Sequence, residues 1–222
     1  MIRAILFDLD GTLLDRQTLV RNLIEDQYFR FSAQLSHVTE EDYSELFADL
    51  DQRGHTPKPL VYELMRNRLG FGTLPEQLAN DYFAQYGRFC VGFPEMTETL
   101  ATLKECQYKL GLVTNGATAL QSSAIHALHL GPVFDSIVIS ESVGVRKPDA
   151  EIFHLSLKSV GVEPAEAVFV GDHPEVDIGG AQRAGMRAIW KRDEYFGSCP
   201  NADAVIEELC ELPDALDRLN RL

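Results

Sequence analysis

Short apolar runs recur along the chain, and their pattern predicts buried strands. They span residues 2–7, 109–114, 136–140, 167–171 and 188–190. Within these runs apolar side chains follow one another and do not alternate with polar ones, which is typical of strands buried on both faces of a parallel sheet. Helix-like segments separate them, as between Pro174 and Gly185, which follow the preference for proline at the start and glycine after the end of a helix. Residues 202–219 are expected to add a short strand and a closing helix. The alternation predicts an α/β fold with a doubly wound, mainly parallel, Rossmann-like sheet.

Residues 16–92 interrupt this alternation and predict helices alone. Apolar residues recur there at helical intervals, as at Leu19 and Leu23, and Thr39 followed by Asp42 marks the start of another helix. No run typical of a strand occurs among them. We therefore expect a helical-bundle cap that is inserted into a catalytic core. The expected core is 1–15 and 93–222, and the expected cap is 16–92.

Composition excludes several classes of function. The formal net charge is −14 and no block of Lys and Arg occurs, so a nucleic-acid surface is not expected. The four cysteines form no CxxC pair, which favours reduced thiols over a disulfide framework. The first apolar run is too short for a signal peptide, and no segment approaches the roughly 20 apolar residues of a membrane span. We expect a cytoplasmic protein, monomeric or homodimeric, that does not bind a membrane.

Polar residues follow four of the predicted strands. They are Asp8 and Asp10 after the first, Thr114, Asn115 and Gly116 after the second, Lys147 after the third, and Asp172 and Asp177 after the fourth. Ligands of open parallel sheets bind beyond the carboxyl ends of the strands, so we expect these residues to converge at one edge. Asp8 and Asp10 face the same side of an extended chain, and two such carboxylates repel unless a cation or a proton separates them.

The chemistry that this set can perform is phosphoryl transfer. An aspartate can attack phosphorus and form an aspartyl-phosphate. The charge on the transferred group is then neutralised by Mg²⁺, Lys, hydroxyl and backbone N–H groups. Mg²⁺ prefers oxygen ligands and keeps several waters, so the carboxylates of Asp8 and Asp172 suffice. The residues alone also allow structural roles for two of these side chains. Asp177 can stabilise the start of its helix by opposing the helix dipole, and Thr114 can be present because threonine favours strands.

Four segments resemble the ordered motifs of a known family. DLDGT (8–12), VTN (113–115), RKP (146–148) and GDHPEVD (171–177) are similar to those of the haloacid dehalogenase superfamily, in its phosphatase-like branch of phosphoglycolate phosphatases and nucleotidases. The helical insertion resembles the C1-type cap of that family. The resemblance covers nearly the whole chain.

By this resemblance, Asp8 would be the nucleophile. Asp10 would protonate the leaving oxygen and then activate water. Thr114 and Lys147 would hold the phosphoryl group, together with Asn115 and Gly116.

The resemblance also implies a metal site. Mg²⁺ would be bound by Asp172, by Asp8 and by the backbone carbonyl of Asp10, and Asp177 would support both Lys147 and the metal. Val176 stands where many relatives have Asn, which puts the local hydrogen bonding in doubt more than the catalysis. We leave His173 out of catalysis.

The implied function is Mg²⁺-dependent hydrolysis of a small phosphorylated metabolite through an aspartyl-phosphate. Dehalogenating members typically lack an aspartate at the place of Asp10, because a halide needs no proton. Two alternatives remain open at this point. One is a phosphosugar mutase of the same superfamily, and the other is a signalling receiver that stores an acyl phosphate.

Overall fold

The computed structural model describes residues 1–72 and 75–221, and residues 73, 74 and 222 of the expected cap and core ranges lie outside this description. The chain forms two compact units. One consists of Met1–Arg16 and Val91–Leu222, and the other of Gln17–Cys90. The assignment of these parts as catalytic core and cap stays a prediction.

The first unit is built on a parallel sheet, which confirms the predicted α/β class. In the described residues the sheet has six strands in the order β3-β2-β1-β4-β5-β6, and every neighbouring pair is parallel. The strands are β1 (Ala4–Phe7), β2 (Lys109–Thr114), β3 (Ser136–Ile139), β4 (Ala167–Gly171), β5 (Arg187–Lys191) and β6 (Ala204–Ile206). Every residue of β1 and β4 is buried, as their unbroken apolar sequences predict.

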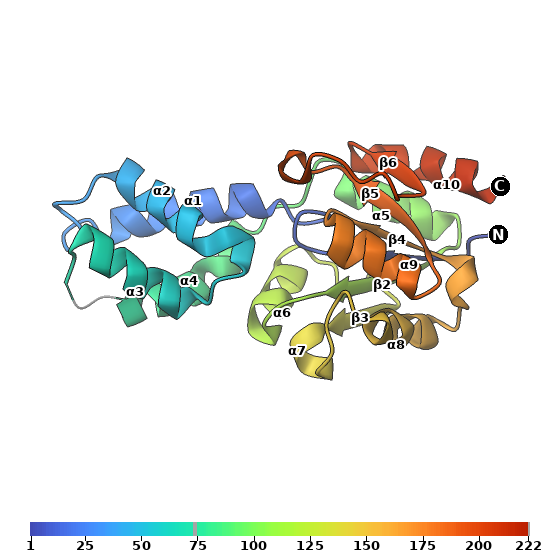
Figure 1. Ribbon diagram of the computed structural model, residues 1–222, viewed down its shortest axis with the longest axis horizontal. Helices are drawn as coiled ribbons and strands as arrows, with labels where there is room; N and C mark the ends of the chain where they lie inside the picture. Colours follow the sequence, from blue (N-terminus) through green and yellow to red (C-terminus); the bar gives the residue numbers. More distant parts are fainter. Residues whose placement is uncertain (73–74, 222) are drawn as a thin grey trace. The chain divides into compact units, whose positions relative to one another are not determined.

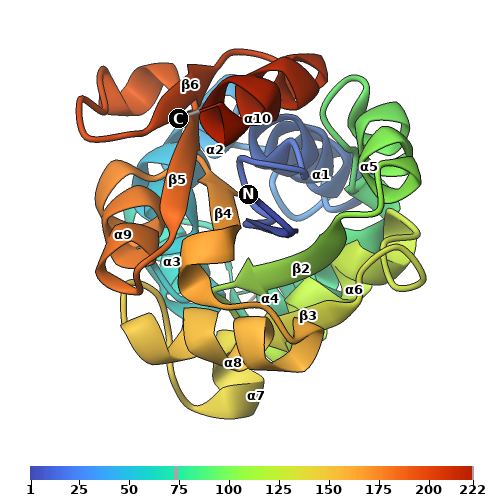
Figure 2. The same ribbon diagram turned by 90° about the vertical axis from the view of Figure 1, so that its right-hand side faces the viewer.

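Helices cover both faces of this sheet, with α8 and α9 on one face and α5 and α10 on the other (Figure 2). The α-helices of this unit are α5 (Met96–Glu105), α6 (Thr118–Ala127), α7 (Ser140–Val143), α8 (Ala150–Val160), α9 (Gly180–Arg183) and α10 (Leu212–Asn220). Short 3-10 turns are η3 (Pro164–Glu166), η5 (Glu194–Phe196) and η6 (Leu209–Glu211). The expected C-terminal strand and helix are present as β6 and α10.

The predicted helix after β4 is divided into a π-helix, η4 (Pro174–Gly179), and α9. The cause lies in its first turn. The amides of Asp177 and Ile178 both donate to the carbonyl of His173, at 3.0 and 3.3 Å, so the turn widens there. The side chain of Asp177 turns back and accepts a hydrogen bond from the amide of His173 at 3.1 Å. Wide turns of this kind often occur at functional sites, because they redirect a side chain.

The second unit contains helices and no strand in its described residues, 17–72 and 75–90 (Figure 1). Its helices are α1 (Arg16–Arg30, which begins at the boundary), α2 (Glu40–Asp51), α3 (Lys58–Leu69) and α4 (Pro75–Gln85), with 3-10 turns η1 (Gln52–Gly54) and η2 (Tyr86–Phe89). Thr39 caps α2 as its sequence predicts, since its hydroxyl accepts from the amide of Asp42 at 3.1 Å. None of the helices in the described part of the chain is long and apolar enough to cross a membrane.

The centre of this helical unit is polar as well as aromatic. Gln27 is fully buried, and its Oε1 accepts hydrogen bonds from the hydroxyls of Tyr43 and Tyr62 at 2.8 and 2.7 Å. Its Nε2 donates to the carbonyl of Leu78 and to Asp81. Gln27 therefore joins α1, α2, α3 and α4. Its side-chain amide donates two hydrogen bonds and accepts two, which fixes the register of the helices.

Candidate active site

The carboxyl ends of three neighbouring strands bring together the polar residues expected there. Asp8 follows β1, Thr114 ends β2 and Asp172 follows β4, and all three are buried. Because β1 lies between β2 and β4, the aspartate that follows it is central in the group. The amide of Asp8 donates to the carbonyl of Val170 at 2.9 Å, so the hydrogen bonding of β1 with β4 continues into the site.

Lys147 reaches this group from the loop between α7 and α8. Its Nζ lies 2.5 Å from Oδ1 of Asp8 and 2.8 Å from Oδ1 of Asp177, and only 3% of the residue is exposed. One ammonium thus joins two carboxylates inside the protein. Its backbone is held as well, because the side chain of Asn115 donates to the carbonyl of Lys147 and accepts from its amide, both at 2.9 Å.

The burial of this group shifts its pKa values. Burial raises the pKa of Asp8 to about 7, against the attraction of Lys147 and with a further contribution from the like charge of Asp177. Burial acts to lower the pKa of Lys147, but the two carboxylates outweigh it and raise that pKa above its ordinary value. The difference follows from the number of partners. Lys147 contacts two opposite charges, whereas Asp8 has one opposite charge, that of Lys147, and the like charges of Asp177 and Asp10 near it.

The same aspartates have the composition of a cation site. One carboxylate oxygen from each of Asp8, Asp172 and Asp177 lies within 4.8 Å of the other two, and all three residues are buried. The three buried carboxylates interact with the ammonium groups of Lys147 and, at Asp172, of Lys191, which still leaves an excess of negative charge that a divalent cation offsets. Hard oxygen donors suit Mg²⁺. The residues present therefore fit the expected metal, and Asp177 belongs to the carboxylate group as well as contacting Lys147.

Gly11 leaves room for one of these carboxylates. It has a φ of +85°, and a Cβ at this position would lie 2.3 Å from Oδ2 of Asp172. The indole N–H of Trp190 on β5 donates to the backbone carbonyl of Asp172 at 2.6 Å, which holds the backbone of this residue. The glycine in DLDGT is thus required by the approach of Asp172 and by the backbone conformation.

Asp10 and Thr114 are joined by a residue that the sequence did not single out. Gln121, in α6, donates from Nε2 to Oδ2 of Asp10 at 2.9 Å and accepts at Oε1 from the hydroxyl of Thr114 at 3.1 Å. The sequence offered one signal, a glutamine within the helix that follows VTNG. Whether this glutamine points toward the site depends on the residue at which the helix starts and on the face that the helix turns to the sheet. Neither can be predicted from sequence spacing alone.

Gly116 and His173 have local structural roles. The amide of Gly116 donates to the hydroxyl of Ser140 at 3.1 Å. The ring Nδ1 of His173 accepts from the amides of Glu175 and Val176, both at 3.2 Å, so this histidine caps the π-helix. The amide of Val176 in the first turn is thus satisfied by a neighbouring side chain.

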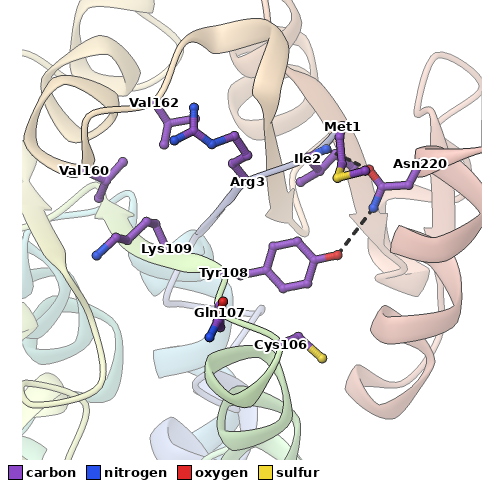
Figure 3. A pocket seen from close by; sticks show the side chains of 10 residues that line it. All are labelled: Met1, Ile2, Arg3, Cys106, Gln107, Tyr108, Lys109, Val160, Val162 and Asn220. Carbon is purple, nitrogen blue, oxygen red and sulfur yellow. Dashed lines mark hydrogen bonds between the residues drawn. The ribbon is translucent and has the colours of Figure 1, made fainter.

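A hollow of about 380 Å³ lies elsewhere in the same unit. It is lined by Arg3, Tyr108, Lys109 and Asn220 among others, and the amide of Asn220 contacts the hydroxyl of Tyr108 (Figure 3). Arg3 precedes β1 and Lys109 begins β2, so this hollow is at the amino ends of the strands. The aspartates lie at the opposite edge, and the hollow is no part of their site.

Comparisons with known proteins identify the family and the fold. The family model described as haloacid dehalogenase-like hydrolase matches residues 5–191. The chain is 34% identical to a glyceraldehyde 3-phosphate phosphatase of Methanopyrus kandleri, over 91% of this chain and 90% of that protein. A crystal structure of a HAD phosphatase from Thermococcus onnurineus superposes with a TM-score of 0.70 at 28% identity, covering 97% of this chain and 98% of that one.

A dehalogenase is also similar. The 2-haloacid dehalogenase of Pseudomonas syringae pv. Tomato is 30% identical with a TM-score of 0.66, and the match covers 99% of this chain and 100% of that one. A family shared by phosphatases and dehalogenases fixes the scaffold and not the reaction. The chain belongs to the haloacid dehalogenase-like hydrolase family.

Proposed function

We propose that this protein is a Mg²⁺-dependent phosphomonoester hydrolase that acts on a small phosphorylated metabolite. The observation that carries the proposal is the buried arrangement of Asp8, Lys147, Asp172 and Asp177 at the carboxyl edge of the sheet. A nucleophilic carboxylate beside an ammonium and a cation site is suited to a phosphate dianion. Relatives named as phosphatases of glyceraldehyde 3-phosphate and phosphoglycolate support the same class of substrate.

In the proposed first step, a carboxylate oxygen of Asp8 attacks phosphorus and the bond to the leaving oxygen breaks. Asp10 gives its proton to that oxygen, which departs as an alcohol. In the second step Asp10 takes a proton from water, which attacks the phosphorus of the aspartyl-phosphate and regenerates the carboxylate of Asp8. Each cycle thus consumes one ester and one water and restores both aspartates.

Binding of the phosphoryl group is assigned to Lys147, Thr114 and the turn at Asn115 and Gly116. Lys147 already contacts Asp8, so its ammonium stands beside the atom that receives phosphorus. Asn115 contributes by fixing the backbone of Lys147. The carboxylates of Asp8 and Asp172 and the backbone carbonyl of Asp10 would hold Mg²⁺, supported by Asp177. When bound, the metal supplies positive charge that offsets the charge on the phosphate and favours the ionised form of Asp8.

The helical unit is proposed as the cap that selects the leaving group and excludes water. We place the enzyme in the cytoplasm, because the four cysteines of the sequence form no CxxC pair, which favours reduced thiols over a disulfide framework. Asp10 favours hydrolysis of an ester over dehalogenation, because an alkoxide needs a proton on departure and a halide does not.

The test is phosphate release with Mg²⁺ from p-nitrophenyl phosphate and from a panel that includes glyceraldehyde 3-phosphate, phosphoglycolate and pyrimidine nucleotides. Asp8→Asn is expected to abolish release from every substrate. Asp135→Asn, which removes an aspartate that pairs with Lys104 and Lys109 near the start of β3, is the matched control and is expected to keep it. Release by the Asp8 variant at the wild-type rate would refute the proposal, and isomer formation from a hexose phosphate without release would indicate a mutase.

A further inference from the structure

Gln121 occupies a position from which one side chain holds two residues of the proposed site. It lies in the first half of α6, and 5% of it is exposed. Its amide nitrogen contacts Oδ2 of Asp10 at 2.9 Å, and its amide oxygen contacts the hydroxyl of Thr114 at 3.1 Å. Asp10 lies 111 residues from Gln121 in the chain, so the contact depends on the tertiary fold.

The chemistry of the partners fixes the direction of both hydrogen bonds. An ionised carboxylate accepts at both oxygens, and a protonated one still accepts at the oxygen that lacks the proton, so the NH₂ group of Gln121 can donate to Oδ2 of Asp10 in both steps of the proposed reaction. The carbonyl oxygen then faces Thr114, whose hydroxyl donates its single proton to it. Both the NH₂ group and the carbonyl oxygen of Gln121 thus make a hydrogen bond. Rotating the amide by half a turn would place its carbonyl oxygen against the acceptor oxygen of Asp10.

The loop after β2 is shaped to admit this amide. A Cβ on Gly116 would lie 2.5 Å from Nε2 and 3.0 Å from Cγ of Gln121. Any larger residue at position 116 would displace the glutamine. The glycine that was assigned to phosphate binding from the sequence thus also makes space for a side chain between Asp10 and Thr114.

We propose that Gln121 is a positioning residue for the proton transfer by Asp10. A carboxylate with one oxygen held has its plane restricted, which restricts the direction in which its other oxygen points. Proton transfer to a leaving oxygen requires such an orientation, since the two atoms must come within hydrogen-bond distance. This inference rests on the proposed hydrolase function and assigns Gln121 no contact with substrate.

The same contact orients Thr114. Because its proton is donated to Gln121, the hydroxyl can hold a phosphoryl oxygen only by giving up that bond. Loss of the amide releases this proton for the phosphate. Removal of Gln121 is therefore expected to affect proton transfer strongly and substrate affinity weakly, a split between kcat and KM that general loss of structure does not produce.

The experiment compares two substrates of similar shape and different leaving groups. Phenyl phosphate and p-nitrophenyl phosphate differ in the basicity of the departing oxygen, and only the more basic phenolate depends strongly on an acid. In Gln121→Met, kcat/KM for phenyl phosphate is expected to fall about 10- to 100-fold, since a positioned acid contributes about 10²- to 10⁴-fold. The fall for p-nitrophenyl phosphate is expected to be several times smaller.

Two further variants separate this role from packing. Gln121→Glu keeps the size and the acceptor for Thr114 but lacks the donor to Asp10, and it is expected to show the same change in the ratio of the two substrates. Gln182→Met, on α9, removes a glutamine that bonds to the carbonyl of Asn201, and it is the matched control with an unchanged ratio. In an Asp10→Asn background, Gln121→Met is expected to change the ratio no further.

An equal fall for both substrates in Gln121→Met, or a wild-type ratio in Gln121→Glu, would overturn the inference and leave the hydrolase proposal standing. A wild-type enzyme that releases phosphate from neither aryl ester nor any metabolite in the panel would overturn both. Fluorescence of Trp190, the single tryptophan, checks that each variant has a folded core.

Discussion

Replacing Asp8 by asparagine is expected to stabilise the metal-free protein while it abolishes hydrolysis. Asp8 is 6% exposed, and its burial is the main cause that raises its pKa from 3.8 to about 7. Asparagine has nearly the same shape and no charge to bury. Lys147 keeps its contact with Asp177 at 2.8 Å, so the ammonium is not left unpaired. The proposed nucleophile is thus expected to lower the stability of the protein, as is common for residues of active sites.

The magnitude follows from the pKa of Asp8. A carboxyl with a higher pKa in the folded than in the unfolded protein binds more protons when folded, so stability falls as the pH rises between the two values. The interval from 3.8 to about 7 is about three pH units, and at about 1.4 kcal/mol each the full cost above pH 7 is about 4 kcal/mol. Part of it is already present at pH 5. The advantage of Asp8→Asn over the wild type is therefore expected to grow by about 2 to 3 kcal/mol between pH 5 and pH 8.

The assay is urea unfolding in EDTA at the two pH values, followed by the fluorescence of Trp190, whose indole N–H contacts Asp172 beside the site. Asp135→Asn is the control of opposite sign. Burial alone would raise the pKa of Asp135, but the amide of Leu110 and the ammonium of Lys104 lower it, so its replacement should destabilise the protein at pH 8. An Asp8→Asn protein that is less stable than the wild type at pH 8, or an advantage that does not change with pH, would refute the reasoning.

Three further predictions concern the metal site, the buried ammonium and the glycine of the first motif. Mg²⁺ at a hundredfold excess over its Kd should stabilise the wild type by about 2.7 kcal/mol and Asp172→Asn much less, as measured by urea unfolding; equal stabilisation of both contradicts a role for this carboxylate. Lys147→Met removes the ammonium that Asp8 and Asp177 share, so it should lower the free energy of unfolding in urea by about 3 to 5 kcal/mol and abolish phosphate release, whereas a stable and active variant would exclude the assigned role. Gly11→Ala should lose phosphate release because its Cβ would lie 2.3 Å from Asp172, whereas Gly161→Ala, at a φ of +70° with open space around the Cβ, should only lose stability. Similar activity of the two variants would contradict the need for space beside Asp172.

The fold could be predicted because its elements differ strongly in pattern. Unbroken apolar runs such as those of β1 and β4 suit only strands with both faces covered, and residues 16–92 lack them altogether. The end of each apolar run marks the end of a strand, so the sequence alone places Asp8, Thr114 and Asp172 at one edge of the sheet. Lys147 lies in the loop after β3, so the same rule placed it at this edge, and the resemblance to a family motif added the expectation that it would hold the phosphoryl group.

The contacts between these residues could not be predicted in the same way. The use of Asn115 on the backbone of Lys147, the π-helix that turns Asp177 inward and the bridging amide of Gln121 all depend on side-chain directions after packing. Helical spacing gives the face of a residue only when the helix start is known. His173 shows the same limit, because its role as a cap requires the local geometry of one turn.

The most direct measurement is to locate the phosphoryl group on the enzyme during turnover. Asp10→Asn with p-nitrophenyl phosphate and Mg²⁺ should form the acyl phosphate but hydrolyse it slowly, because the leaving group needs no acid and the water lacks its base. Acid quenching and borohydride reduction should then convert Asp8, and no other aspartate, to homoserine, which is detected by peptide mass spectrometry. Homoserine at another position, or none while phosphate is still released, would contradict nucleophilic attack by Asp8.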